Sequence, residues 1–326
     1  MKSIERSIIA TLAYYDAFRL PLTLVEMHER LIPSKRLGES AERPSLGELA
    51  SSVDALVRSE VVHVDSGFYS LSFDYLHGGA RRIERQKESA MKWKRMLRSA
   101  RWLQMAPFVR ALLGSGSMAY DATSAQSDWD FLVIVERRRL YTARAGLLLT
   151  AWLMGRLRTK RHRQAPDLFC FNHYLTTDGL ALRHRSMFTG HGVAWLIPVM
   201  DEGHMLERLW GANRWMEDVV PRPSTPEFVR RAIPRNAVLL FVRRVFEFLL
   251  RSWIGSFVER TIQRWMQRRI MRDPATHARG GRVIADDFEL EFHPHSFELV
   301  ALNRYNATLK RYGMSGFTER DSGLRR

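Results

Sequence analysis

The 326-residue sequence has a single cysteine, Cys170, so an internal disulfide framework is excluded and a reducing compartment is expected. It also lacks a long apolar run: the longest, at 145–155, is far shorter than the roughly 20 residues of a membrane-spanning helix. The first residues include Glu5 and no small-residue cleavage site, which predicts no signal peptide. We therefore expect a cytoplasmic protein without a transmembrane segment.

Acidic residues are scarce, with 35 Asp and Glu against 51 Lys and Arg and a formal net charge of +16. The imbalance begins after residue 75. Residues 1–75 hold 8 Lys and Arg against 11 Asp and Glu, whereas the remainder holds 43 against 24. A basic surface of this kind favours a polyanion such as a nucleoside triphosphate, a nucleic acid or an acidic membrane. The alternative is a well-solvated basic protein that has no such partner.

The first 76 residues have the pattern of three helices followed by a hairpin. Apolar spacing predicts helices at 4–17 and 46–58 with a shorter one between them, and alternation around 65–67 predicts the hairpin. This order is typical of winged-helix modules, which often bind DNA through the third helix. Here that helix has Arg58 as its one basic residue, so we favour an interaction or packing role over DNA binding.

The middle of the chain alternates between helix and strand patterns, which predicts an α/β fold. A basic helix is expected at 79–104, and it either lines an anion site or links two domains with a solvated face. Two strands are expected around 108–114 and 128–135, and a third in the segment PDLFCFNHYL, residues 166–175. Residues 186–216 alternate between helical and irregular patterns.

The segment at 234–272 is a long helical pattern in which apolar stripes alternate with arginine. Its apolar positions include Val238, Val242, Val245, Leu249, Trp253, Phe257 and Ile262. Such stripes usually form a core or a dimer seam, which is the preferred interpretation. The alternative is a basic amphipathic helix that lies on an anionic membrane.

Residues 114–135, GSGSMAYDATSAQSDWDFLVIV, end in a strand that carries two carboxylates. Because side chains alternate along a strand, Asp128 and Asp130 share one face, while Trp129 and Phe131 point into a core. Two neighbouring carboxylates are costly to bury unless a cation lies between them. Hard oxygen ligands of this kind suit Mg²⁺ or Mn²⁺.

A glycine- and serine-rich turn lies upstream of this strand. Glycines at 114 and 116, followed by Ser117, allow the backbone to approach a ligand closely, and backbone N–H groups in such a turn can hold phosphate. A phosphate turn followed by a strand with metal-binding carboxylates predicts phosphoryl or nucleotidyl transfer.

The order Gly116-Ser117, ten intervening residues, then Asp128-x-Asp130 within apolar residues resembles the signature of the DNA polymerase β-type nucleotidyltransferase superfamily. Segments such as CFNHYL, GANRWM and EFHPHSFELVALNRY resemble predicted bacterial nucleotidyltransferases of unassigned substrate. This resemblance implies transfer of a nucleoside monophosphate from a nucleoside triphosphate, with ATP as the first candidate, to an unidentified acceptor hydroxyl. The acceptor would be a small molecule, a protein or a nucleic-acid end.

The resemblance also implies roles for particular residues. Gly116 and Ser117, together with Ser127, would bind the triphosphate, and Asp128 and Asp130 would hold two Mg²⁺ or Mn²⁺ ions while pyrophosphate leaves.

The superfamily adds a third metal-binding carboxylate on a neighbouring strand, and Asp167 is the best match, although Pro166 precedes it. Asn172 is the other residue that could face the site, and its amide can bind a metal but cannot act as a base. With Asn172 in that position, the alternative function is a catalytically weakened protein that binds nucleotide, or binds nucleic acid through its basic surface.

The expected architecture has three parts: a winged-helix-like module at 1–76, a small mixed-sheet nucleotidyltransferase core with its leading basic helix at 77–182, and a mainly helical region at 183–326 with a short strand near 283–293. The oligomeric state is left open.

Two other features are interpreted as structural and not as functional. Glu289 and Glu291 alternate as the solvated face of an edge strand, and Cys170, between two phenylalanines, is expected in the core.

Overall fold

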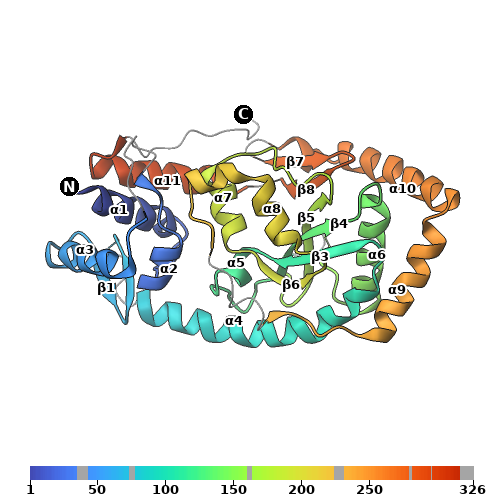
Figure 1. The fold of residues 1–326 in the computed structure, drawn as a ribbon, viewed down its shortest axis with the longest axis horizontal. Helices are drawn as coiled ribbons and strands as arrows, with labels where there is room; N and C mark the ends of the chain where they lie inside the picture. The colour runs from blue at the N-terminus through green and yellow to red at the C-terminus, as the bar shows by residue number, and fades with distance from the viewer. Residues whose placement is uncertain are drawn as a thin grey trace.

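The computed structural model describes residues 1–34, 43–72, 78–159, 164–223, 231–278, 281–294 and 296–315. These residues form a mixed α/β structure in which helices surround a six-stranded mixed sheet, beside a small two-stranded antiparallel sheet (Figure 1). The expectation of an α/β fold is confirmed at this level. Among the described residues, no helix is both long and apolar enough to cross a membrane.

The elements follow one another along the chain as helices and short strands. The α-helices are α1 (Ser3–Asp16), α2 (Leu24–Glu29), α3 (Leu46–Arg58), α4 (Gly78–Ala100), α5 (Gly116–Ala119), α6 (Leu140–Leu153), α7 (Met187–Ala194), α8 (Met205–Ala212), α9 (Ala237–Leu250), α10 (Trp253–Met271) and α11 (Glu298–Arg311). The 3₁₀ helices are η3 (Arg101–Met105), η4 (Arg214–Asp218) and η6 (Pro274–His277). The strands are β1 (His63–Asp65), β2 (Phe68–Ser70), β3 (Val109–Gly114), β4 (Trp129–Val135), β5 (Phe169–Thr176), β6 (Ile197–Asp201), β7 (Arg282–Ala285) and β8 (Glu289–His293).

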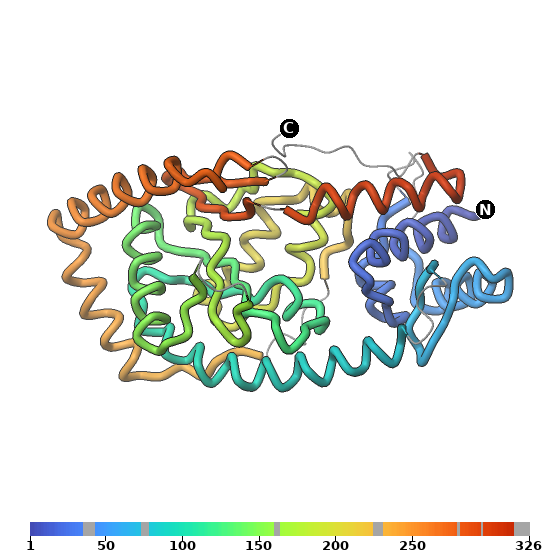
Figure 2. The backbone as a smooth tube through the Cα atoms, turned by 180° about the vertical axis from the view of Figure 1, so that it is seen from behind, coloured from blue at the N-terminus to red at the C-terminus, as the bar shows by residue number. Residues whose placement is uncertain are grey.

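The N-terminal unit contains α1, α2, α3 and the β1–β2 hairpin, as the sequence pattern predicts. Helix α3 begins where a capping box allows it to: Ser45 accepts a hydrogen bond from the backbone N–H of Glu48, whose carboxylate accepts one from the Ser45 N–H. The core of this unit also takes side chains from the far end of the chain, namely Leu302, Tyr305 and Leu309 of α11. Figures 1 and 2 show α11 lying beside α1.

Asp16, at the end of α1, is expected to make this unit less stable as the pH rises. Its carboxylate accepts a 2.8 Å hydrogen bond from the Leu71 N–H, but burial outweighs this bond and raises its pKa from 3.8 to about 7. The folded state therefore holds a proton that the unfolded state has released between these values. Relative to Asp16→Asn, the wild type should lose roughly 1 kcal/mol of unfolding free energy per pH unit in this window. Urea unfolding at several pH values measures this difference, and a constant difference would contradict it.

The central sheet has the strand order β6-β3-β4-β5-β8-β7, with β4 and β5 parallel and every other pair antiparallel. Strand β4 lies inside the sheet, which explains its nearly continuous apolar sequence. The sequence pattern did not predict β6, an edge strand that contains Pro198, which weakens a strand signal. The single strand expected near 283–293 is two strands, β7 and β8. Strands β6, β7 and β8 all come from the segment after residue 182, so the sheet draws on both halves of the chain.

Each face of the sheet packs against its own apolar core. On one face, β4 contributes Trp129, Phe131 and Val133 to a core that includes residues of α4 and α6. On the other face, Leu132 and Ile134 pack with residues of α7 and α8. The alternation predicted for β4 is therefore present, and its polar positions share the α7–α8 face.

Helices α9 and α10 do not form a core with most of their apolar side chains. Val238, Val245 and Leu249 of α9 and Trp253 and Phe257 of α10 are all exposed, between 42% and 80%. The expectation of a core position was therefore wrong for these residues, while the expectation of a dimer seam stays a prediction. The physical reason is that Arg243, Glu247 and Glu259 occupy much of the surface that these helices turn inward.

Candidate functional site

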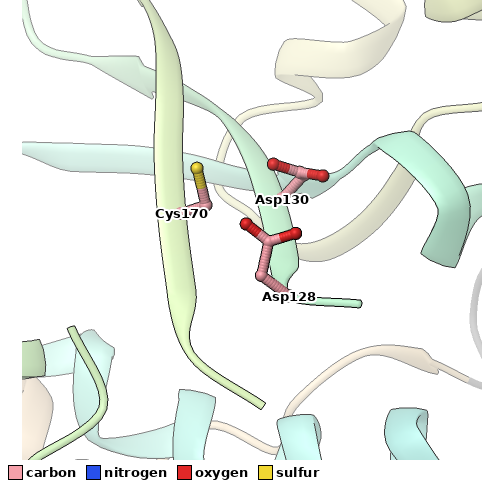
Figure 3. A group of neighbouring side chains, drawn as sticks. All are labelled: Asp128, Asp130 and Cys170. Carbon is pink, nitrogen blue, oxygen red and sulfur yellow. The ribbon is translucent and has the colours of Figure 1, made fainter. Parts of the chain in front are cut away.

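Asp128 and Asp130 lie on the same side of the sheet, as strand alternation requires (Figure 3). Their neighbours Trp129 and Phe131 are each 1% exposed in the opposite core, which fixes the direction of the two carboxylates. Cys170 of β5 points toward the same place because it pairs with Asp130 in the parallel β4–β5 ladder. The ligand atoms of these three residues all lie within 4.8 Å of one another.

Asp130 is held from both main chain and side chain. Its carbonyl oxygen accepts a 2.9 Å hydrogen bond from the Ser115 N–H, and its Oδ1 accepts a 2.9 Å bond from the amide of Asn172. Burial first, and the negative charge of Asp128 second, raise the pKa of Asp130 to about 7. A carboxylate in this position accepts a proton readily unless a cation compensates its charge.

Arg158 forms an ion pair with Asp128 at the exposed rim of the group. The same guanidinium nitrogen lies 3.7 Å from the Cys170 sulfur. The sequence motif did not identify Arg158, because it lies outside the motif and reaches the site only through the bridge of Leu157 to Phe169, beside β5. Its charge at the mouth of the group suits an incoming phosphate.

The glycine turn touches the carboxylate pair directly. Gly116 has a φ of 61°, and a Cβ added to it would lie 2.6 Å from Oδ2 of Asp130. This position thus needs glycine twice, for its backbone conformation and for its close contact. Ser117 follows in the short helix α5, where its carbonyl oxygen accepts a bond from the Ala122 N–H. The turn predicted to bind phosphate is therefore adjacent to the carboxylates predicted to bind a metal.

Gly116→Ala is expected to lower the free energy of unfolding by about 1–2 kcal/mol and to displace the Asp130 carboxylate. Gly67→Ala is the matched control, because Gly67 also has a positive φ, 80°, but nothing lies within 4 Å of an added Cβ. Both variants should lose stability, and only Gly116→Ala should reduce the thermal stabilisation that Mg²⁺ gives. Equal Mg²⁺ responses in the two variants would contradict the contact.

Ser127 forms hydrogen bonds that stabilise the loop before β4. Its hydroxyl accepts a 3.0 Å hydrogen bond from the Ser124 N–H, and its carbonyl oxygen accepts one of 2.8 Å from Lys92. Lys92 of α4 is 1% exposed and also donates to the Ala125 carbonyl oxygen. The basic helix therefore fixes the loop between turn and carboxylates. The buried residues of α4, among them Ser89, Lys92, Trp93 and Met96, recur at helical spacing. This spacing could have revealed the packing role of the helix.

The Asp167 side chain bonds to residues of α4 and is not part of the group formed by Asp128, Asp130 and Cys170. One of its oxygens accepts a 2.9 Å bond from Lys92, and the other accepts a 2.7 Å bond from Arg95. It precedes β5 in a turn with a φ of 57°, so it is not carried by the strand that faces Asp130. The structure brings Cys170 and Asn172, instead of Asp167, to the pair.

The donor set fits one hard divalent cation. Two carboxylates supply the oxygen ligands that Mg²⁺ or Mn²⁺ prefers. The thiol adds little to such a site, because sulfur is a soft ligand and Mg²⁺ and Mn²⁺ prefer oxygen. Without a cation, burial and the charges of Asp130 and Asp128 raise the pKa of Cys170. Cys170 was expected in the core, but it is partly exposed and its neighbours Phe169 and Phe171 fill the core instead. Within the described residues, no third carboxylate joins this group.

A second polar group occupies the same face of the sheet, further along. His173 of β5 lies 2.9 Å from Glu289, and Glu289 and Glu291 are 4% and 2% exposed. The expectation of a solvated edge strand was therefore wrong: β8 lies between β5 and β7. Arg282 pairs with both oxygens of Glu291, at 2.7 Å each, so the charge that would attract a metal is already compensated. This group is a structural ion-pair network.

Comparison of the chain with protein-family models, with curated proteins and with solved structures finds no match.

Proposed function

We propose that the protein is a Mg²⁺-dependent nucleotidyltransferase that moves a nucleoside monophosphate from a nucleoside triphosphate, ATP first among them, to an acceptor hydroxyl. The observation that carries the proposal is the direct contact between the Gly116 turn and the Asp130 carboxylate, with Asp128 beside it. The turn offers backbone N–H groups to phosphate oxygens, and the carboxylate pair offers oxygens to a divalent cation.

In this proposal the residues of the chain bind and orient the reactants. Asp128 and Asp130 would hold Mg²⁺, which when bound offsets negative charge on the phosphates. Arg158 would move from Asp128 to a phosphate oxygen. The acceptor oxygen bonds to the α-phosphorus, its proton leaves to solvent, and the bond between the α-phosphorus and the bridging oxygen breaks in line, releasing pyrophosphate.

We further propose that α1–α3 and the β1–β2 hairpin form a winged-helix-like module that packs against the rest of the chain. Support comes from its core, which already contains α11 side chains, and from α3, whose last turn carries Arg58 as its basic residue. A phosphate-binding surface needs more positive charge than this helix presents.

The second candidate function is nucleotide binding without turnover. One observation favours this function: the residues of β5 that lie beside the carboxylate pair are a thiol, Cys170, and an amide, Asn172. A catalytic set of three carboxylates would need an acidic residue there. Neither group can act as a base here: the raised pKa of Cys170 favours its protonated thiol, and an amide is not a base.

The test is incubation with each α-labelled nucleoside triphosphate, Mg²⁺ and an extract separated into small molecules, proteins and nucleic acids. Transfer of label with pyrophosphate release, lost in Asp128→Asn, supports the enzyme. Calorimetric binding of Mg²⁺ and nucleotide without release, also lost in Asp128→Asn, supports the binding protein. Nucleotide binding that survives Asp128→Asn combined with Asp130→Asn would contradict both.

A further inference from the structure

Helices α9 and α10 expose most of their apolar side chains, whereas three charged side chains, Arg243, Glu247 and Glu259, are buried, the reverse of an ordinary surface helix. The exposed apolar side chains are Val238, Phe241, Val245, Phe246, Phe248, Leu249, Trp253, Ile254, Phe257, Trp265 and Met271. The two most exposed, Trp253 at 80% and Phe248 at 79%, flank the corner between the helices. Figures 1 and 2 both show this corner as the outermost point at one end of the molecule.

The buried charges explain why α9 turns this way. Arg243 is 7% exposed and donates to both oxygens of Glu202, at 2.8 and 2.9 Å. Glu247 is also 7% exposed and accepts 2.8 and 2.9 Å bonds from the Phe108 N–H and from Arg110. Rotating α9 to hide its apolar face would break these bonds, so its orientation is fixed by the rest of the protein.

Helix α10 is oriented in the same manner. Glu259 is 8% exposed and accepts hydrogen bonds of 2.9 and 2.7 Å from the N–H groups of Tyr141 and Thr142, at the start of α6. Large exposed apolar patches on a folded protein mark an interaction surface. A pair of helices held apolar side outward by buried ion pairs and hydrogen bonds is therefore built to meet an apolar partner.

The charges around this patch select the partner. Residues 237–272 contain eight arginines and two glutamates, and both glutamates are among the buried, bonded residues. Four of the arginines, Arg264, Arg268, Arg269 and Arg272, line an open hollow of about 720 Å³ on α10. A second copy of this chain would bring two arginine-rich patches together, since a two-fold interface pairs a patch with itself. A nucleic acid would match the arginines but not the exposed phenylalanines.

We propose that α9 and α10 form a docking surface for an anionic phospholipid membrane. Aromatic and aliphatic side chains at the α9–α10 corner enter the interface, and the arginines of α10 bind lipid phosphates. This surface would hold the protein at the membrane plane, and it is independent of the Asp128–Asp130 site, which lies on the central sheet.

The test is flotation of the full-length protein with phosphatidylcholine vesicles, with and without phosphatidylglycerol, at low and high salt. We expect binding to anionic vesicles only, weakened by salt. Combining Phe248→Ser with Trp253→Ser should reduce partitioning by at least about tenfold, from the apolar area no longer buried. The matched control combines Val25→Ser with Met91→Ser, which are 55% and 53% exposed on other helices and should change nothing.

The charged part is tested separately. Arg264→Ser with Arg268→Ser should weaken partitioning by about fivefold for each arginine, whereas Lys94→Ser with Arg98→Ser, exposed on α4, should have little effect. Three results would overturn the proposal. The first is failure to bind anionic vesicles, and the second is a protein that does not bind vesicles but forms a dimer, which Phe248→Ser with Trp253→Ser makes monomeric. The third is binding of duplex DNA that Phe248→Ser with Trp253→Ser leaves unchanged.

Discussion

Asp130→Asn is expected to reduce pyrophosphate release on the order of a thousandfold and to abolish Mg²⁺ binding, while making the metal-free protein more stable. The two effects have one cause. Burial and the charge of Asp128 raise the Asp130 pKa to about 7, so the ionised side chain costs stability that only a cation restores. The wild type loses this stability as the pH rises from 3.8 toward 7, and the neutral amide does not. Without metal, the variant should be more stable by up to about 4 kcal/mol above pH 7.

The opposite signs of these effects separate a lost function from a lost fold. Mg²⁺ should raise the melting temperature of the wild type and leave that of Asp130→Asn unchanged, because the proposed site would bind it in the folded wild type alone. Glu84→Gln is the control carboxylate, since Glu84 is exposed on α4, where it forms an ion pair with the exposed Lys87. The prediction fails if Asp130→Asn is less stable than the wild type without metal, or if Mg²⁺ stabilises both proteins equally.

Arg282→Met is expected to lower the free energy of unfolding by about 4 kcal/mol. Arg282 compensates two buried carboxylates, Glu291 at 2.7 Å and Glu298 at 2.9 Å, whose side chains are 3% and 1% exposed. Since Glu291 lies in the sheet and Glu298 begins α11, the variant leaves uncompensated charge where the sheet meets the helix that packs on α1. Arg183→Met is the matched control: Arg183 and its partner Asp286 are 55% and 33% exposed, so its loss should cost under about 1 kcal/mol.

The effect of Arg282→Met should depend on pH in a defined direction. Burial alone raises the pKa of Glu291, but His173 and Arg282 outweigh it and lower the pKa from 4.5 to about 2. The stabilisation from this carboxylate is therefore present above pH 4.5 and lost as the pH falls toward 2. In the variant Glu291 should take up a proton more readily, so the difference from the wild type should be largest at neutral pH and shrink in acid. Denaturant unfolding at several pH values measures it, and a deficit that grows in acid would contradict the network.

Local patterns in the sequence determined much of this structure. The helix at 46–58, the hairpin around Gly67 and the strand with Trp129 and Phe131 in the core are where the sequence predicts them. Caps, turn residues and alternation act over a few residues, so these features are readable without tertiary information. Strand β6 was missed because it is short and contains Pro198, and β7 was not separated from β8 in the strand expected near 283–293.

The sequence by itself established that Asp128 and Asp130 share a face beside a glycine turn, because the period of a strand and the freedom of glycine are local properties. Only the tertiary structure decided which other side chains lie beside Asp128 and Asp130. Asp167 pairs with Lys92 and Arg95, whereas Cys170 and Asn172 of β5 face the pair, since the β4–β5 register sets which residues become neighbours. It also decided which sides of α9 and α10 face water: their buried ions bond to residues far away in the sequence, and no periodicity within a helix encodes such partners.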